Sequence, residues 1–120
     1  MKDRILIDIK EDVKTIDLPP LPSNIGKRRK TIDIKGDIRF FTILDEISFH
    51  QSTNPKKAIY IQRIQFEKEG SIELRLGYYI IGKKPRVIGK WVWGQFAMML
   101  SPNNFCTAYR LAMEKGWLDC

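Results

Sequence analysis

The segment from residue 72 to residue 81 constrains the fold of this chain more than any other. Ile72, Leu74, Leu76, Tyr78 and Ile80 alternate there with Glu73, Arg75, Gly77, Tyr79 and Ile81. Successive side chains of a β-strand point to opposite faces, so this period of two predicts a long strand with one buried face. One strand cannot bury its own face, and we therefore expect an antiparallel sheet that is covered on one side.

Neighbouring segments predict further strands of the same sheet. Residues 59–66 are rich in β-branched and aromatic side chains, and residues 67–70 form a turn before the alternating segment. Residues 90–100 predict the next strand, with Trp91 and Trp93 on one face. Residues 31–35 predict a shorter strand. The pattern is that of an antiparallel meander.

The last segment predicts a helix with matching start and stop signals. Ser101 suits the N-cap, Pro102 suits the first helical position, and Gly116 suits the left-handed position just past the end. We expect this helix to place its apolar stripe on the sheet.

Residues 38–50 are open to two interpretations. Phe40, Ile43, Leu44 and Ile47 fall on one helical face, and Asp37 suits an N-cap, which together favour a helix. The alternative is a hairpin turn at Gly36-Asp37 followed by a strand, because the segment is rich in strand-forming residues.

The whole pattern predicts an α+β fold. Its sheet is an antiparallel meander of three to four strands, with a preceding helix and a C-terminal helix packed on one face. Three prolines near residue 20 exclude regular structure there, because proline lacks an N–H donor. We expect residues 1–16 to form an N-terminal arm with a strand, 17–30 a proline-rich and basic linker, and 31–120 a single α+β domain.

The net charge of +7 is unevenly distributed. Residues 51–100 hold nine basic and three acidic side chains, whereas residues 101–120 hold two of each. A localised basic region is the electrostatic feature expected of a protein that binds a polyanion. A solvated surface that aids solubility is the simpler alternative.

Composition excludes several classes of protein. No apolar run approaches the roughly 18–20 residues needed to span a bilayer, and the N-terminal residues lack the apolar core of a secretory signal. Two cysteines cannot make a disulfide framework, and with one histidine they cannot make a zinc site. We therefore expect a cytoplasmic protein with no membrane partner, no metal and no cofactor.

The basic loop, residues 82–90, is the first candidate binding site. It carries four cations between two glycines, which let the backbone approach a phosphate closely. These cations are Lys83, Lys84, Arg86 and Lys90. The upstream cluster Lys27-Arg28-Arg29-Lys30 is expected to act as a second, flexible phosphate contact.

An aromatic strand face is the second candidate site. If Leu74 and its neighbours lie under the helices, the opposite face presents Arg75 and Tyr79, and the next strand adds Trp91 and Trp93. Rings interleaved with cations suit single-stranded nucleic acid, because bases stack on the rings while cations follow the backbone. The alternatives are that these tryptophans belong to the core or to a protein interface.

The acidic residues support a weaker hypothesis. Glu46 and the sequence Glu73-Leu74-Arg75 resemble the helix carboxylate and Glu-x-Lys pair of restriction-endonuclease-like nucleases, which implies Mg²⁺ chemistry. Arginine stands where that family has lysine, and no aspartate precedes the pair at the usual place. Solvated strand charges explain these residues more simply.

One block is distinctive in its residues. Gly77-Tyr78-Tyr79-Ile80-Ile81-Gly82-Lys83-Lys84-Pro85-Arg86, followed by Gly89-Lys90-Trp91-Val92-Trp93-Gly94-Gln95-Phe96, resembles a block of uncharacterised bacterial and phage-associated proteins. The resemblance covers roughly residues 52–118 and implies no activity. In layout alone, the chain is similar to positive-cofactor-four type coactivators, which implies a dimeric platform for single-stranded DNA.

The leading hypothesis from the sequence is a small, basic, non-catalytic protein that binds single-stranded or distorted DNA or RNA. The basic loop and Lys27–Lys30 would contact phosphate, Arg75 would bridge, and the three aromatic side chains would stack. The alternative is a protein-interaction module, such as a phage or mobile-element factor that binds a host protein. A Mg²⁺-dependent nuclease ranks third, and homodimer formation stays open.

Overall fold

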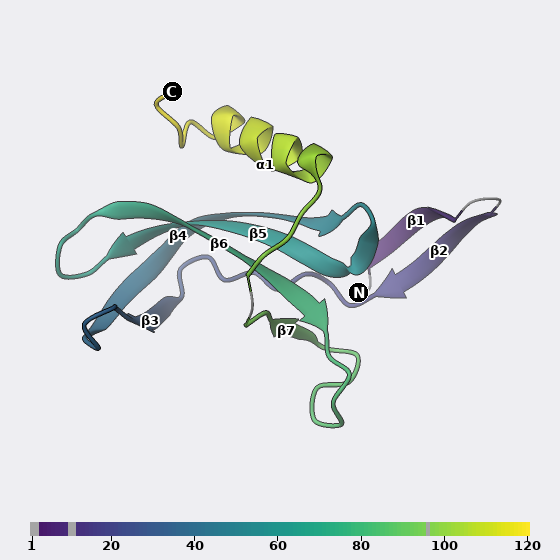
Figure 1. Ribbon diagram of the computed structural model, residues 1–120, viewed down its shortest axis with the longest axis horizontal. Helices are drawn as coiled ribbons and strands as arrows, with labels where there is room; N and C mark the ends of the chain where they lie inside the picture. The colour runs from purple at the N-terminus through teal and green to yellow at the C-terminus, as the bar shows by residue number, and fades with distance from the viewer. Residues whose placement is uncertain (1–2, 10–11, 96) are drawn as a thin grey trace.

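A computed structural model describes residues 3–9, 12–95 and 97–120. Its elements are β1 (Asp3–Ile9), β2 (Asp12–Leu18), β3 (Arg28–Ile32), β4 (Ile38–Gln51), β5 (Asn54–Phe66), β6 (Ile72–Ile81), β7 (Trp91–Trp93) and α1 (Pro102–Glu114). Strands β3 to β7 form one antiparallel sheet in chain order, and α1 lies on one side of it (Figure 1). The α+β class and the antiparallel meander are confirmed, with five strands in place of three to four.

The prediction of a helix over residues 38–50 is wrong, because this segment is strand β4. It pairs with β3 on one side and β5 on the other. The register shifts between Ile43 and Asp45, which marks a β-bulge. A bulge moves the following side chains to the other face of the sheet. Phe41 and Ile43 are therefore buried on one face and Ile47 on the opposite face, which produces a helix-like apolar spacing.

The predicted linker is shorter than expected at both ends. Strand β2 runs to Leu18 and pairs with β1 as a separate hairpin, so the N-terminal arm contains two strands. Strand β3 begins at Arg28, earlier than the predicted 31–35, and is the edge strand beside β4. Most of the cluster Lys27–Lys30 therefore lies on an ordered strand and not in a flexible linker.

The last strand is also shorter than predicted. Among the described residues of this segment, Trp91–Trp93 pair with β6, and the chain then leaves the sheet at Gly94. The main-chain N–H of Gly94 donates to the carbonyl of Tyr78 at 2.7 Å. The predicted position of Phe96 on this strand lies outside the described residues.

The C-terminal helix has the predicted ends. The Ser101 side chain accepts a hydrogen bond from the N–H of Asn104 at 3.1 Å, and Pro102 occupies the first turn. Gly116 has a positive φ of 73°, and the N–H of Trp117 donates to the carbonyl of Ala112. These contacts form a Schellman C-terminus. Among the described residues, no helix is long and apolar enough to cross a membrane.

Two small cores stabilise the two faces of the sheet. Phe41, Ile43, Ile64 and Phe66 form one core on the face away from α1, where the two phenylalanine rings meet edge to face at 5.7 Å. Ile47 and Ile61 form the other core with Ala108 and Ala112 of α1. The helix therefore packs over β4 and β5.

Candidate nucleic-acid interface

The register of the sheet places the predicted aromatic residues on one face. Tyr79 is paired with Trp93, and Ile81 with Trp91, so both tryptophans share the face of Tyr79 and Arg75. This face, which we call the aromatic face, is turned away from α1. Strand β5 adds Tyr60, whose ring lies 4.8 Å from that of Tyr79. Trp93 lies 5.0 Å from Tyr79 in a T-shaped arrangement, so these rings form one packed cluster.

Gly77 makes room for this cluster. A Cβ atom added at Gly77 would lie 2.1 Å from Cζ2 of Trp93. The indole therefore packs directly on the β6 backbone, which only a glycine permits at this distance.

The Gly77→Ala variant is expected to lose about 1–3 kcal/mol of unfolding free energy, the usual cost of overpacking. The Trp93 ring would have to move, although Tyr60 and Tyr79 hold it in place. Urea denaturation followed by near-ultraviolet circular dichroism measures the loss. Combining Gly77→Ala with Trp93→Phe removes the outer atoms of the indole ring and should recover part of the lost unfolding free energy. An unchanged midpoint in Gly77→Ala would contradict the packing.

A segment of the predicted linker crosses the aromatic face. We call residues 18–26 the proline strap; it runs along the side of the sheet opposite α1 (Figure 1). Trp91 Nε1 donates to the carbonyl of Pro19 at 2.9 Å, and Tyr60 Oη donates to the carbonyl of Pro22 at 2.6 Å. Carbonyls in a proline-rich segment lack partners from regular structure, so they are free to accept from aromatic side chains. Trp91 is half-buried where it meets the strap, and Trp93 is half-buried against Tyr79 and Arg75.

A buried polar network fixes the end of the strap. Asn24 donates from its main-chain N–H and from Nδ2 to the two carboxylate oxygens of Glu46, each at 3.1 Å. Gln62 Nε2 donates to the same carboxylate at 2.7 Å, and Gln62 Oε1 accepts from Arg75 Nη1 at 2.8 Å. Asn24 and Gln62 are 4% and 1% exposed. The network thus connects strap, β4, β5 and β6.

This network also defines the roles of Glu46 and Arg75. The Glu46 carboxylate accepts hydrogen bonds from amide donors, and no group of three His, Cys, Asp or Glu suited to a metal ion occurs among the described residues. Burial lowers the pKa of Arg75, with Tyr79 opposing and Arg29 adding to that effect. The Arg75 guanidinium lies 4.5 Å from the Trp93 ring centroid. Arg75 is therefore half-buried among side chains of the aromatic face.

The basic loop leaves the sheet between β6 and β7. The N–H of Gly82 donates to the carbonyl of Lys90 at 2.8 Å, and the N–H of Lys90 donates to the carbonyl of Val87 at 2.9 Å. The N–H of Val87 donates to the carbonyl of Lys84 at 3.0 Å. These internal hydrogen bonds give the loop a defined shape.

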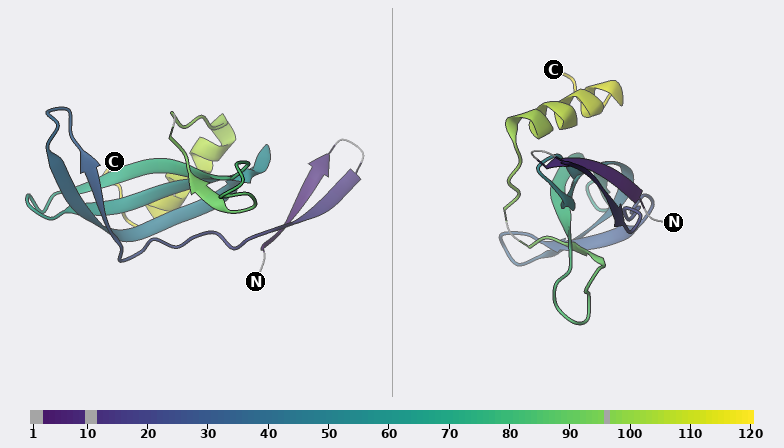
Figure 2. Two further views of the ribbon diagram at one scale, coloured as in Figure 1. Left: turned by 90° about the horizontal axis from the view of Figure 1, so that it is seen from below. Right: turned by 90° about the vertical axis from the view of Figure 1, so that its right-hand side faces the viewer.

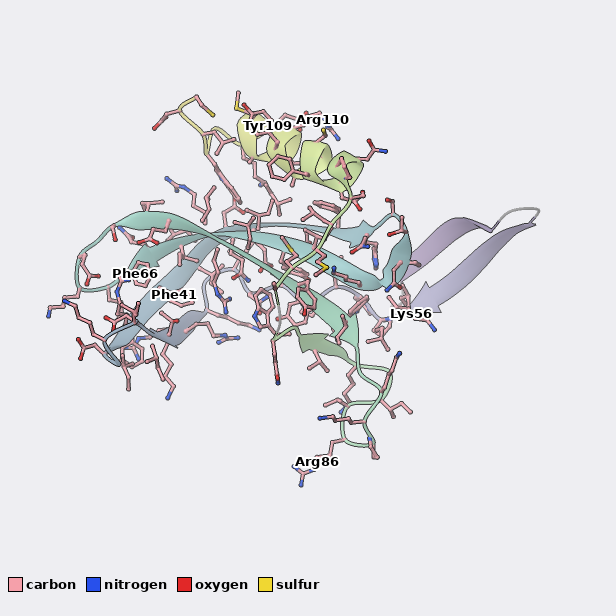
Figure 3. The ribbon with its side chains drawn as sticks, in the orientation of Figure 1. Phe41, Lys56, Phe66, Arg86, Tyr109 and Arg110 are labelled. Carbon is pink, nitrogen blue, oxygen red and sulfur yellow. The ribbon has the colours of Figure 1, made fainter. Side chains whose placement is uncertain are left out.

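All four cations of the basic loop are exposed. The loop lies on the side of the sheet opposite α1 (Figure 2, right), and Arg86 projects from it (Figure 3). No Asp or Glu occurs between Glu73 and Glu114, and within the described residues no ion pair neutralises these four side chains. The loop is a region of uncompensated positive charge.

The residues of the cluster Lys27–Lys30 have different surroundings. Arg28 forms an ion pair with Glu67, which raises the pKa of Arg28 and lowers that of Glu67, and its guanidinium lies 3.8 Å from the Phe40 ring. Arg29 pairs with Phe41 and so lies on the same side of the sheet as the aromatic face. All four residues are exposed. Arg28 has a carboxylate partner within the protein, so Lys27, Arg29 and Lys30 are the better candidates for phosphate contact.

The sequence did not predict the proline strap or the roles of Tyr60, Gln62 and Asn24. Tyr60 and Gln62 occupy alternate positions of β5 and so lie on one face of the sheet. The polar groups that they carry at buried positions were the signal that could have identified them. Asn24 has no sequence signal, because its importance comes only from meeting Glu46 across 22 residues of chain.

Comparisons of this chain with protein-family models, with curated proteins and with solved structures find no match.

Proposed function

We propose that this protein binds nucleic acid without catalysis, through the basic loop. The observation that supports this proposal is the structure of the loop. Its four cations are exposed, and its backbone is held by internal hydrogen bonds. No carboxylate pairs with these cations in the described part of the chain. Like charges this close repel one another unless an anion lies between them. A phosphate backbone supplies such anions at regular intervals.

The ordered shape of the loop supports this proposal. A flexible tail loses conformational entropy when it binds, whereas a preformed loop has lost most of it on folding. Arg29, Lys27 and Lys30 on and beside β3 extend the positive charge to the other end of the sheet. Phosphate contacts of this kind are independent of sequence.

Stacking of bases belongs to a second step of the proposed function. Trp91 and Tyr79 contact the proline strap, and Trp93 packs against Tyr79 and beneath Arg75, so bases reach these rings only where the strap gives way. Unpaired or distorted strands can present such bases, whereas an intact duplex keeps them stacked. The proposed preference for single-stranded or distorted sites therefore depends on the strap.

Replacing Lys84 and Arg86 by glutamine is expected to reduce the salt dependence of binding. Each phosphate contact contributes about −0.7 to the slope of log K against log salt for a single strand. The slope should become shallower by about 1.4, and affinity at 0.1 M salt should fall about 25-fold. Fluorescence anisotropy of a labelled oligothymidine at several salt concentrations measures both.

The double variant Lys68→Gln, Arg110→Gln is the matched control. It removes one lysine from the turn between β5 and β6 and one arginine from α1. The slope of this variant should stay within the error of the unchanged protein. Binding that ignores salt, or equal losses in both variants, would overturn the proposal. Failure to bind any oligonucleotide would instead favour an acidic protein as the partner of the loop.

A further inference from the structure

An apolar groove lies between α1 and strand β6. The helix packs over β4 and β5, and the β6 side chains Leu74 and Leu76 on this side stay 36% and 54% exposed. The groove has a volume of about 190 Å³, and its lining includes Leu74 and Leu76 of β6, Met98 and Leu100 of the following segment, and Phe105 and Tyr109 of α1. Leu76 is 54% exposed and Phe105 is 57% exposed. Apolar side chains this exposed and this close together mark an interaction surface.

The edge of β6 beside this groove is open. Within the described residues, β7 pairs with β6 only from Tyr79 to Ile81. The carbonyl of Tyr78 points outward, because it accepts from Gly94. Backbone groups of a strand alternate in direction, so the N–H and C=O groups of Ile72, Leu74 and Leu76 also point outward. An open edge of this kind is a template for another strand.

We propose that two copies of this chain form a homodimer through antiparallel pairing of their β6 edges, with the two-fold axis at Leu74. Leu74 would pair with Leu74 of the second copy, and Ile72 with Leu76 of the second copy. Glu73 would lie opposite Arg75 of the second copy. A surface that meets itself across a two-fold axis needs this self-complementarity.

Charge and hydrogen bonding select this register from its neighbours. An axis at Glu73 or at Arg75 would place like charges opposite each other, which destabilises cross-strand pairs. An axis at Leu76 would pair Leu74 with Tyr78, whose carbonyl already accepts from Gly94. An axis at Ile72 would pair Leu74 with Gly70, which lies in the turn at a φ of 70°. Leu74 is the remaining centre that brings opposite charges together and whose outward backbone groups have no strand partner in the described part of the chain.

The same arrangement covers the apolar groove. Side chains of Ile72, Leu74 and Leu76 point to the α1 side of the sheet, so both copies would place them together at the two-fold axis. Phe105 and Tyr109 of each helix would flank this contact (Figure 3 shows Tyr109 on α1). The two basic loops would remain exposed on the opposite side of one continuous sheet. This inference goes beyond the proposed function and does not depend on it.

Sedimentation equilibrium of the full chain over a range of micromolar concentrations tests the homodimer. The expected mass is twice the 14.1 kDa of one chain. Leu74→Lys would place two lysines opposite each other at the axis and should raise the dissociation constant about a hundredfold or more, because such contacts cost several kcal/mol. Ile80→Lys, on the same face but inside the β7 pairing, is the matched control and should leave the dimer intact.

Cross-linking supplies a second measurement that does not depend on the stability of the lysine variant. In a Cys106→Ser, Cys120→Ser background, Leu74→Cys should form an intermolecular disulfide on mild oxidation, and Ile80→Cys should not. Paired strands bring opposite Cα atoms within the range that a disulfide spans. A chain that stays monomeric at every concentration would overturn the inference. So would a dimer that survives Leu74→Lys and fails to cross-link at residue 74.

Discussion

Replacing Phe41 by alanine is expected to lower the free energy of unfolding by about 3–5 kcal/mol, the usual cost of removing a buried phenylalanine. Phe41 is 1% exposed and meets Phe66 edge to face in the core away from α1. The Arg75 guanidinium lies 5.4 Å from its ring centroid, so the cavity would also adjoin a charged group. The midpoint of urea denaturation measures the loss.

The neighbouring residue provides the control. Phe40 is half-buried and lies beneath Arg28 at the sheet surface, so Phe40→Ala should cost much less. A strand predicts this large difference, because adjacent side chains point to opposite faces. The helix that the sequence favoured would place Phe40 on its buried face. Equal losses in the two variants would therefore contradict strand β4.

Local signals identified β6 as a strand and gave the ends of α1. The period of two in residues 72–81 separated the two faces of the strand, but the face of Leu74 and Leu76, which was expected to be buried, is 36% and 54% exposed at these residues. Ser101, Pro102 and Gly116 identified the helix ends because each satisfies a local backbone requirement. The shared face of the tryptophans also followed, since Trp91 and Trp93 are two residues apart.

Non-local contacts explain what the sequence did not predict. The bulge between Ile43 and Asp45 arises in the pairing of β4 with β5, and its effect on periodicity imitates a helix. The proline strap was interpreted as a linker because prolines exclude regular structure. It is ordered by contacts with Glu46, Tyr60 and Trp91, which lie 22 to 72 residues away.

The strap also changes what the aromatic residues can do. A stacking platform was predicted from the composition of one strand face, and the rings do share that face. Each ring, however, already contacts another ring or the strap, and Trp93 is in addition covered by Arg75. The basic loop has no such cover, so it is the part of the predicted site that is accessible without rearrangement.

The Asn24→Ala variant is expected to release the proline strap at a cost of about 3 kcal/mol. Asn24 contributes two hydrogen bonds to the Glu46 carboxylate, but alanine retains the main-chain N–H and loses the side-chain donor. The Glu46 carboxylate therefore loses its Nδ2 donor, and the Tyr79 hydroxyl loses Asn24 Oδ1 as its acceptor. Hydrogen bonds to charged groups contribute about 1.5–3 kcal/mol, and the half-buried Glu46 carboxylate that loses a donor adds part of a desolvation cost. Ser23→Ala is the matched control, because Ser23 is exposed on the same segment.

Acrylamide quenching of tryptophan fluorescence in a Trp117→Phe background follows the release, since Trp91 and Trp93 then report alone. Quenching should increase in Asn24→Ala and stay unchanged in Ser23→Ala. The proposed function also predicts that Asn24→Ala, with its rings uncovered, binds oligothymidine more tightly, because each stacked base contributes about 1–3 kcal/mol. Unchanged quenching would show that the strap does not depend on Asn24. Increased quenching with weaker binding would mean that the strap itself contributes to the nucleic-acid surface, and the rings do not.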